Sequence, residues 1–140
     1  MPAKPETVSR ERRAAMNAGS PAPRRSAKRA ALGRGARGEW LAALALRLKG
    51  WRIVARNFRC RQGEIDIVAR KGDLIAFVEV KARASPGGAV DAVGRESQRR
   101  IADAAGVWIG RQRDRDRLSW RFDIVAVTPW RWPHHFEDAF

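Results

Sequence analysis

The sequence QGEIDIVARKGDLIAFVEVKAR, residues 62–83, predicts a β-hairpin with charged groups on one face, around which the other elements can be placed. Apolar residues alternate with a period of two on either side of Lys71-Gly72-Asp73, as they do in half-buried strands. A glycine at the first position of a two-residue loop suits a type II′ turn. The stretch therefore predicts two antiparallel strands joined at Gly72 and Asp73.

This register predicts that ionisable side chains meet across the hairpin. Asp66 would face Glu79, and Glu64 would face Lys81, on the face that also carries Phe77. Two directly opposed carboxylates destabilise a sheet, and a bound cation would remove that cost. A three-residue loop with a bulge would instead shift every pair and rotate the faces. An ordinary surface ion pair between Glu64 and Lys81 is a further alternative.

Length and charge bound the class of protein. The chain has 140 residues, with 29 Lys and Arg against 15 Asp and Glu, a net charge of +14 and a pI of about 11.6. Such a length allows one domain with a real core and a tail. The charge favours a polyanionic partner, nucleic acid ahead of a membrane surface, although an arginine-rich genome would also raise it.

Cysteine content and hydropathy bear on the compartment. The single cysteine, Cys60, excludes an internal disulfide and fits a reducing cytoplasm. No apolar run reaches the roughly 18 residues that a membrane span needs, so we expect a cytoplasmic protein without a membrane partner.

Composition divides the chain at about residue 33. Residues 1–32 are rich in Ala, Pro, Ser, Arg and Lys, which predicts a disordered basic arm, either a loose phosphate contact or an inert tail. Residues 33–140 form one predicted domain, and residues 129–140 form apolar cover for its sheet or an aromatic surface that stacks on bases. The other elements predicted around the hairpin are a helix at 33–50, a strand at 51–59, a loop at 84–91, a helix at 94–111 and a strand at 119–128.

The pattern of Asp66, Glu79 and Lys81 suits the hydrolysis of phosphodiesters. Mg²⁺ or Mn²⁺ held by the two carboxylates and a strand carbonyl would neutralise the phosphate and lower the pKa of a bound water. Lys81 would position that water or offset developing charge. Glu64 or Glu39 would hold a second metal or steer the waters around the first.

Other polar residues have a bland alternative beside the functional one. Glu39 lies early in the predicted first helix, where an acid is favoured by the helix dipole. Gln98 extends the buried stripe of the second helix, either as a satisfied core amide or as a group aimed into the site. Arg121 and Asp123 share a strand face two residues apart, which indicates a local ion pair. Candidate nucleic-acid contacts are Arg56, Arg83, Arg95, Arg99 and Arg100.

Several ordered motifs resemble those of a known family. They are GRGARGEWLAALALRLKGWRIVARNFRCRQGEIDIVARKGDLIAFVEVKAR, QRRIADAAGVWI, RFDIVAV and the closing AF. Together they resemble the bacterial YraN-like proteins over about residues 33–140. The resemblance implies an α/β, restriction-endonuclease-like fold of the PD-(D/E)XK type, akin to Holliday-junction resolvases. Its core has the order α-β-β-β-α-β, with a central mixed sheet flanked by helices.

The resemblance also implies roles for individual residues. Glu39 is similar to the acid of the first helix, Asp66 and Glu79 to the metal-binding acids, Lys81 to the catalytic lysine, and Gln98 to a supporting glutamine. Ile65 replaces the proline of the motif, and Ser97 stands where relatives carry a lysine.

The implied activity is that of a Mg²⁺- or Mn²⁺-dependent endonuclease on DNA rather than RNA, with branched or recombining DNA as a candidate substrate. A binding or adaptor protein on the same fold is the alternative. Resolvase-like activity would require a homodimer, for which Trp130 and Trp132 offer a face.

Overall fold

The computed structural model describes the backbone of residues 21–140 and the side chains of residues 35–140. The chain divides into two units after Gly35, and residues 36–140 carry the candidate site. The first twenty residues of the predicted arm lie outside the described part.

The first helix, α2, runs from Pro21 to Leu48 and is longer than the predicted helix at 33–50. Residues 21–32, the second part of the predicted basic arm, belong to this helix, where Ala and Arg have high helix propensity and Pro21 suits the first helical position. The predicted stop at Gly50 is confirmed. Gly50 takes a φ of 92°, and the N–H groups of Gly50 and Trp51 donate to the carbonyls of Arg47 and Leu46.

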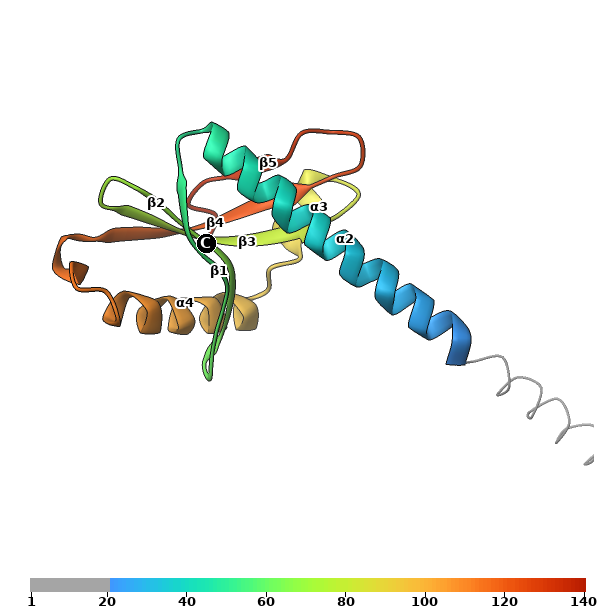
Figure 1. Cartoon of the computed structure of the whole chain (residues 1–140), viewed down its shortest axis with the longest axis horizontal. Helices are drawn as coiled ribbons and strands as arrows, with labels where there is room; N and C mark the ends of the chain where they lie inside the picture. The colour runs from blue at the N-terminus through green and yellow to red at the C-terminus, as the bar shows by residue number, and fades with distance from the viewer. Residues whose placement is uncertain (1–20) are drawn as a thin grey trace, which may run out of the picture. The chain divides into compact units, whose positions relative to one another are not determined.

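Five strands form one mixed sheet in the order β1-β2-β3-β4-β5. All neighbours are antiparallel except β3 and β4, which are parallel, with Leu74 beside Ser119 and Ala82 beside Val127. The element order confirms the expected α/β class and its α-β-β-β-α-β core (Figure 1). The strands are β1 (Arg52–Cys60), β2 (Gly63–Lys71), β3 (Leu74–Ala82), β4 (Ser119–Val127) and β5 (His134–Phe136).

The predicted register of the β2–β3 hairpin is confirmed for its first half. The pairs run from Lys71 with Leu74 to Ile67 with Val78, and Gly72 in the turn has a φ of 61°. The further pairs predicted for Asp66 with Glu79 and for Glu64 with Lys81 are wrong. The ladder between β2 and β3 ends at Ile67, whereas β2 stays paired with β1 as far as Gly63. Figure 1 shows this β1–β2 hairpin running past α4.

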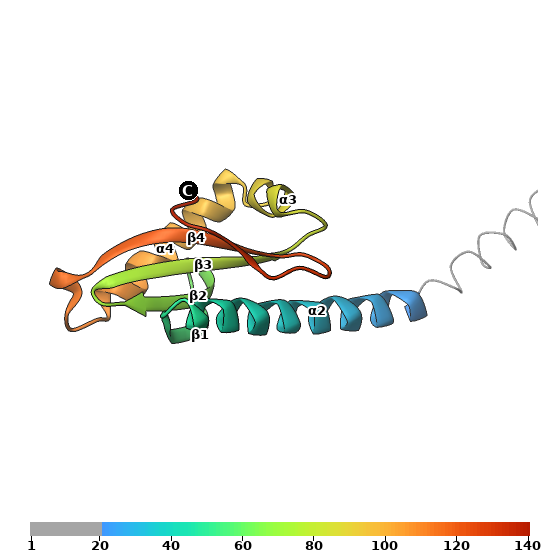
Figure 2. The ribbon, with the colours of Figure 1, turned by 90° about the horizontal axis from the view of Figure 1, so that it is seen from above.

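Two apolar layers hold the sheet between helices (Figure 2). Helix α2 packs Ala42, Ala43 and Leu46 on the face that carries Ala76 and Val78. Helix α4 (Arg95–Gly110) covers the other face, as its predicted buried stripe requires. The members of that stripe, Ile101, Ala104, Ala105, Trp108 and Ile109, are all buried.

Two short elements correct the sequence prediction. The segment expected as a loop at 84–91 contains helix α3 (Pro86–Asp91), because Ser85 caps the Gly88 N–H at 3.2 Å and Pro86 starts the helix. Residues 134–136 add the edge strand β5, although Phe136, Ala139 and Phe140 do cover the core as predicted. Among the described helices, none combines the length and hydropathy needed to cross a membrane.

Candidate active site

The candidate site lies where β2 separates from β3. One residue past the last ladder pair, Asp66 Oδ2 accepts a hydrogen bond from the backbone N–H of Val80 at 2.8 Å. The carboxylate takes the place of a strand carbonyl, because a backbone N–H at such a fork still needs a partner. The fork therefore holds Asp66 against the end of β3.

Glu79 and Lys81 flank Val80 on β3 and are paired with each other. Lys81 Nζ lies 3.1 Å from Glu79 Oε1, and both side chains are mostly buried. Because β3 is fixed by parallel pairing with β4 through Glu79, Val80 and Lys81, the backbone that presents them is held on one side by the sheet. The sequence predicted this grouping of Asp66, Glu79 and Lys81, but through direct pairing rather than a fork.

The surroundings of Asp66 disfavour its charge. Burial raises the pKa of Asp66 to about 7, and the nearby charge of Glu79 adds to the effect. The Val80 N–H and Lys81 act in the opposite direction but do not cancel it. A partly desolvated carboxylate beside a second one is a group that a cation would stabilise.

Glu39 reaches the same site from α2. A Cβ on the preceding residue, Gly38, would lie only 3.9 Å from Val80, which shows how closely α2 approaches the end of β3. Burial raises the pKa of Glu39, Asp66 raises it further, and a hydrogen bond with Asn57 works against the rise. Because α2 begins at Pro21, Glu39 lies in the middle of the helix, and the helix-dipole alternative does not account for it.

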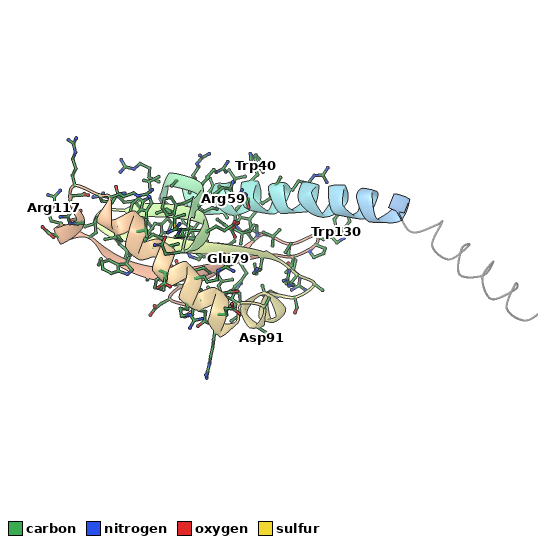
Figure 3. The ribbon with its side chains drawn as sticks, turned by 90° about the horizontal axis from the view of Figure 1, so that it is seen from below. Trp40, Arg59, Glu79, Asp91, Arg117 and Trp130 are labelled. Atoms are coloured by element: carbon green, nitrogen blue, oxygen red, sulfur yellow. The ribbon has the colours of Figure 1, made fainter. Side chains whose placement is uncertain are left out.

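A cleft of about 360 Å³ opens beside Asp66 and Glu79, between the β1–β2 hairpin and α4. Gly63 makes this approach feasible, because a Cβ there would lie 2.7 Å from the carbonyl oxygen of Arg100. Figure 3 shows two residues of the cleft lining, Arg59 from β1 and Glu79 from β3. The cleft is lined by Arg59, Cys60, Gly63, Glu64, Asp66, Glu79, Ser97, Arg100 and Ile101.

The two supporting residues occupy different places. Glu64 lines the cleft, and its carboxylate lies 3.6 Å from Arg59 Nε rather than near Lys81. Gln98 donates from Nε2 to the carbonyl of Val93 at 3.0 Å, at the start of α4. Of the two alternatives that the sequence leaves open for Gln98, this bond matches an amide satisfied within the fold rather than one aimed into the site.

The five candidate arginines do not form one patch. Arg100 lines the cleft, whereas Arg95 and Arg99 are exposed along the first turns of α4. Arg56 is exposed on β1 and lowers the pKa of Glu39 through its charge. Arg83 follows β3 and donates from Nη1 to the carbonyl of Ala82 at 2.7 Å.

The donors present suit a hard cation. Oxygen ligands from carboxylates are those that Mg²⁺ and Mn²⁺ prefer, and Mg²⁺ keeps several of its waters. Within the part of the chain that the structure describes, no three His, Cys, Asp or Glu side chains converge as a ready-made set. Asp66 and Glu79 supply carboxylate oxygens of this kind, and water would fill the remaining positions of an ion bound there.

Sequence reasoning missed residues that only the fold brings to the cleft. Arg59 lines the cleft because the turn between Cys60 and Gly63 places Arg59 opposite Glu64. Predicting that turn from the sequence could have indicated this position of Arg59. Asn57 lies in β1 with a φ of 49°, an unusual backbone for a strand residue, and reaches Glu39. Nothing in the local sequence marks Asn57 for that contact.

A second polar cluster lies on β4 and β5, away from the cleft. Asp123 is fully buried and is bonded to Arg121, as the sequence predicted, at 3.0 Å. It also bonds His135 Nε2 at 2.7 Å and the backbone N–H of Asp138 at 2.9 Å. These bonds fasten the C-terminal segment to the sheet.

Comparison with known proteins identifies the family. Residues 38–127 match the model of the uncharacterised protein family UPF0102. A UPF0102 protein of Mesorhizobium japonicum is 64% identical over 107 residues, which cover 76% of this chain and 86% of that protein. A UPF0102 protein of Agrobacterium fabrum is 61% identical over 117 residues, covering 84% of this chain and 93% of that protein. The chain belongs to the UPF0102 family, which is the YraN-like family that its motifs indicated.

Proposed function

We propose that this protein is a metal-dependent endonuclease that hydrolyses phosphodiester bonds of DNA. The observation that carries the proposal is the meeting of Asp66, Glu79 and Lys81 at one fork of the sheet, beside an open cleft. Separate strands supply the two acids, and the lysine lies 3.1 Å from one of them.

Each residue would have a distinct task. Asp66 and Glu79 would hold Mg²⁺ or Mn²⁺, which supplies charge neutralisation at the phosphate and a water of lowered pKa. Lys81 would release Glu79 to the cation and turn toward the attacking water or the developing charge. Glu39 would orient water from the α2 side, and Asn57 would hold Glu39 in place.

The charge of the chain supports a nucleic acid as substrate. A net charge of +14 attracts a polyanion, and Arg59 and Arg100 line the cleft itself. Arg59 and Arg100 would contact phosphates that flank the scissile bond, which positions the strand without reading its sequence. DNA with branches is the proposed substrate class, and the proposed compartment is the cytoplasm, where Cys60 would remain a free thiol.

A binding or adaptor protein without catalysis is the second candidate. It is favoured by the ion pair between Lys81 and Glu79, which occupies one carboxylate, and by a charge that serves binding without any metal. Both candidates require nucleic-acid binding, but only the first requires Asp66.

The deciding experiment incubates pure protein with supercoiled, linear and four-way-junction DNA in Mg²⁺, Mn²⁺ or EDTA. We expect cleavage only with metal, reduced at least about a hundredfold in Asp66→Asn and in Lys81→Ala. Asp73→Asn and Lys71→Ala, at the exposed far end of the same hairpin, are matched controls and should cut normally. Cleavage that persists in Asp66→Asn would refute the assignment, and metal-independent binding without cleavage would favour the second candidate.

A further inference from the structure

The loop between β4 and β5 presents an unusual amount of aromatic surface. Trp130 is fully exposed, at 103% of its reference area, and Trp132 is 55% exposed. Arg131 lies between them and is also exposed, and we call these three residues the tip. Large exposed aromatic side chains next to a cation are uncommon on a surface that has no partner.

The backbone of this loop is conformationally restricted. Pro129 and Pro133 bracket the segment, and proline fixes φ and restricts the residue before it. Trp130 has a φ of 61°, a conformation in which a bulky residue is an outlier. A stiff tip loses little conformational entropy when it meets a partner.

The tip leaves the sheet at the same end as the candidate active site. Parallel pairing places Lys81 beside Ala126 and Ala82 beside Val127, and β5 returns opposite Ala126 at His134. Residues 127–133 therefore project beyond the strand positions that neighbour Lys81. In Figure 3, Trp130 lies at one end of the domain and Arg117, which precedes β4, lies at the other.

Reach and charge favour a nucleic acid over a second copy of the chain. Trp130 follows Val127 by three residues, so its Cα lies within about 11 Å of that strand end. About three stacked nucleotides span that length, at roughly 3.4 Å each. The backbone N–H of Arg83 donates to the Val127 carbonyl at 3.1 Å, so Arg83 adds positive charge at the base of the loop to the charge of Arg131 within it. Like charges on a second copy would oppose pairing at this place.

We propose that the tip formed by Trp130, Arg131 and Trp132 is a base-stacking element that binds unpaired bases of a branched or gapped nucleic acid at the end of the sheet where Lys81 lies. Aromatic faces stack on any base, whereas bases inside a continuous duplex do not offer their faces. The element thus selects for single-stranded character while the phosphates lie on Arg83 and Arg131. This inference rests on the proposed action on nucleic acid and specifies the part of the substrate that is recognised.

The test measures binding in EDTA, so that metal-dependent cleavage does not enter. Fluorescence anisotropy compares a labelled duplex that contains a single-stranded gap with a fully paired duplex of equal length. Trp130→Asn, which keeps a residue that tolerates positive φ, should weaken binding to the gapped DNA at least about fivefold. Binding to the paired duplex should change less than about twofold, and Trp130→Phe should recover most of the loss.

Trp120→Ala is the matched control, since Trp120 is 49% exposed near the opposite end of β4. This variant should bind both DNAs as the wild type does. Equal losses on both DNAs, or no loss on either, would overturn the proposal. A change in oligomeric state by light scattering in Trp130→Asn would also overturn it, because the tip would then be a protein interface. If the wild-type protein never cuts DNA but the gap-specific loss appears, the endonuclease proposal fails while the stacking element stands.

Discussion

Asp66 on β2 is half-buried and Asp123 on β4 is fully buried, and their surroundings have opposite effects on their pKa values. Asp123 accepts bonds from Arg121, His135 and the Asp138 N–H, which outweigh its burial and lower its pKa. Asp66 accepts one backbone bond beside a second carboxylate, and burial raises its pKa to about 7. Burial therefore marks neither as functional, and what separates them is whether the protein supplies enough partners.

The tautomer of His135 follows from its neighbours. Its Nδ1 lies 3.3 Å from Lys49 Nζ, an ammonium that can only donate, so Nε2 carries the proton and donates to Asp123. The cluster joins the end of α2, the sheet and the C-terminal segment. A carboxylate that is satisfied within the protein needs no ligand, in contrast to Asp66.

The largest expected effect is on stability at the satisfied aspartate. Asp123→Ala leaves Arg121, His135 and a backbone N–H without their acceptor, so we expect a loss of about 3 kcal/mol in the free energy of unfolding. Urea unfolding followed by tryptophan fluorescence measures it. A loss no larger than that of an exposed variant such as Asp116→Ala would contradict the structural role assigned to this cluster.

A second expected effect concerns the wall of the Asp66 cleft. Gly63→Ala places a Cβ 2.7 Å from the Arg100 carbonyl oxygen, and backbone must shift to relieve the contact. We expect a loss of about 2 kcal/mol in unfolding free energy. Gly106→Ala on α4, where a Cβ meets nothing within 4 Å, should instead stabilise the protein by about 0.5 kcal/mol. Similar results for both variants would show that the hairpin does not need this close approach.

For Asp66, the comparison with Asp123 predicts a gain rather than a loss in the free energy of unfolding. Asp66→Asn removes a disfavoured charge and keeps an oxygen for the Val80 N–H, so it should stabilise the metal-free protein by about 1 kcal/mol above neutral pH. The same urea titration measures the gain. Destabilisation by Asp66→Asn would mean that the carboxylate is satisfied as Asp123 is.

The two aspartates should also respond to pH in opposite ways, with smaller effects. The pKa of Asp66 is raised from 3.8, so its penalty is absent below that value and grows as the pH rises toward about 7. The pKa of Asp123 is lowered from 3.8, so its stabilisation is present above that value and is lost as the pH falls through the folded pKa. Unfolding free energies of Asp66→Asn and Asp123→Asn relative to the wild type, measured across pH, should show these opposing slopes.

Much of the fold could be predicted from local signals in the sequence. Alternation around Gly72 gave the β2–β3 register as far as Ile67, and helical spacing gave α4 and its buried face. Ser85 before Pro86 is also a helix-start signal, although the small residues that follow predict a loop. The start of α2 was missed because a composition poor in apolar residues lacks the periodic signal that marks a packed helix.

The geometry of the site was less accessible. An alternating pattern predicts that two strands pair along their whole length, and no local pattern shows that β2 leaves β3 after Ile67. The sequence thus grouped Asp66, Glu79 and Lys81 correctly but paired Glu64 with Lys81, whereas Glu64 lies beside Arg59. The contacts from α2, α4 and Asn57 come from long-range packing, which a single chain read in order does not encode locally.

The proposal that Asp66 and Glu79 together bind a divalent cation rests on Asp66, a carboxylate whose charge is disfavoured by burial and by Glu79. Calorimetric titration of the full chain with Mn²⁺ at slightly alkaline pH tests it most directly, with Asp73→Asn as the exposed-acid control. We predict saturable binding to the wild type and to Asp73→Asn, and affinity at least about tenfold weaker in Asp66→Asn. Equal Mn²⁺ affinity in Asp66→Asn and the wild type would contradict the account.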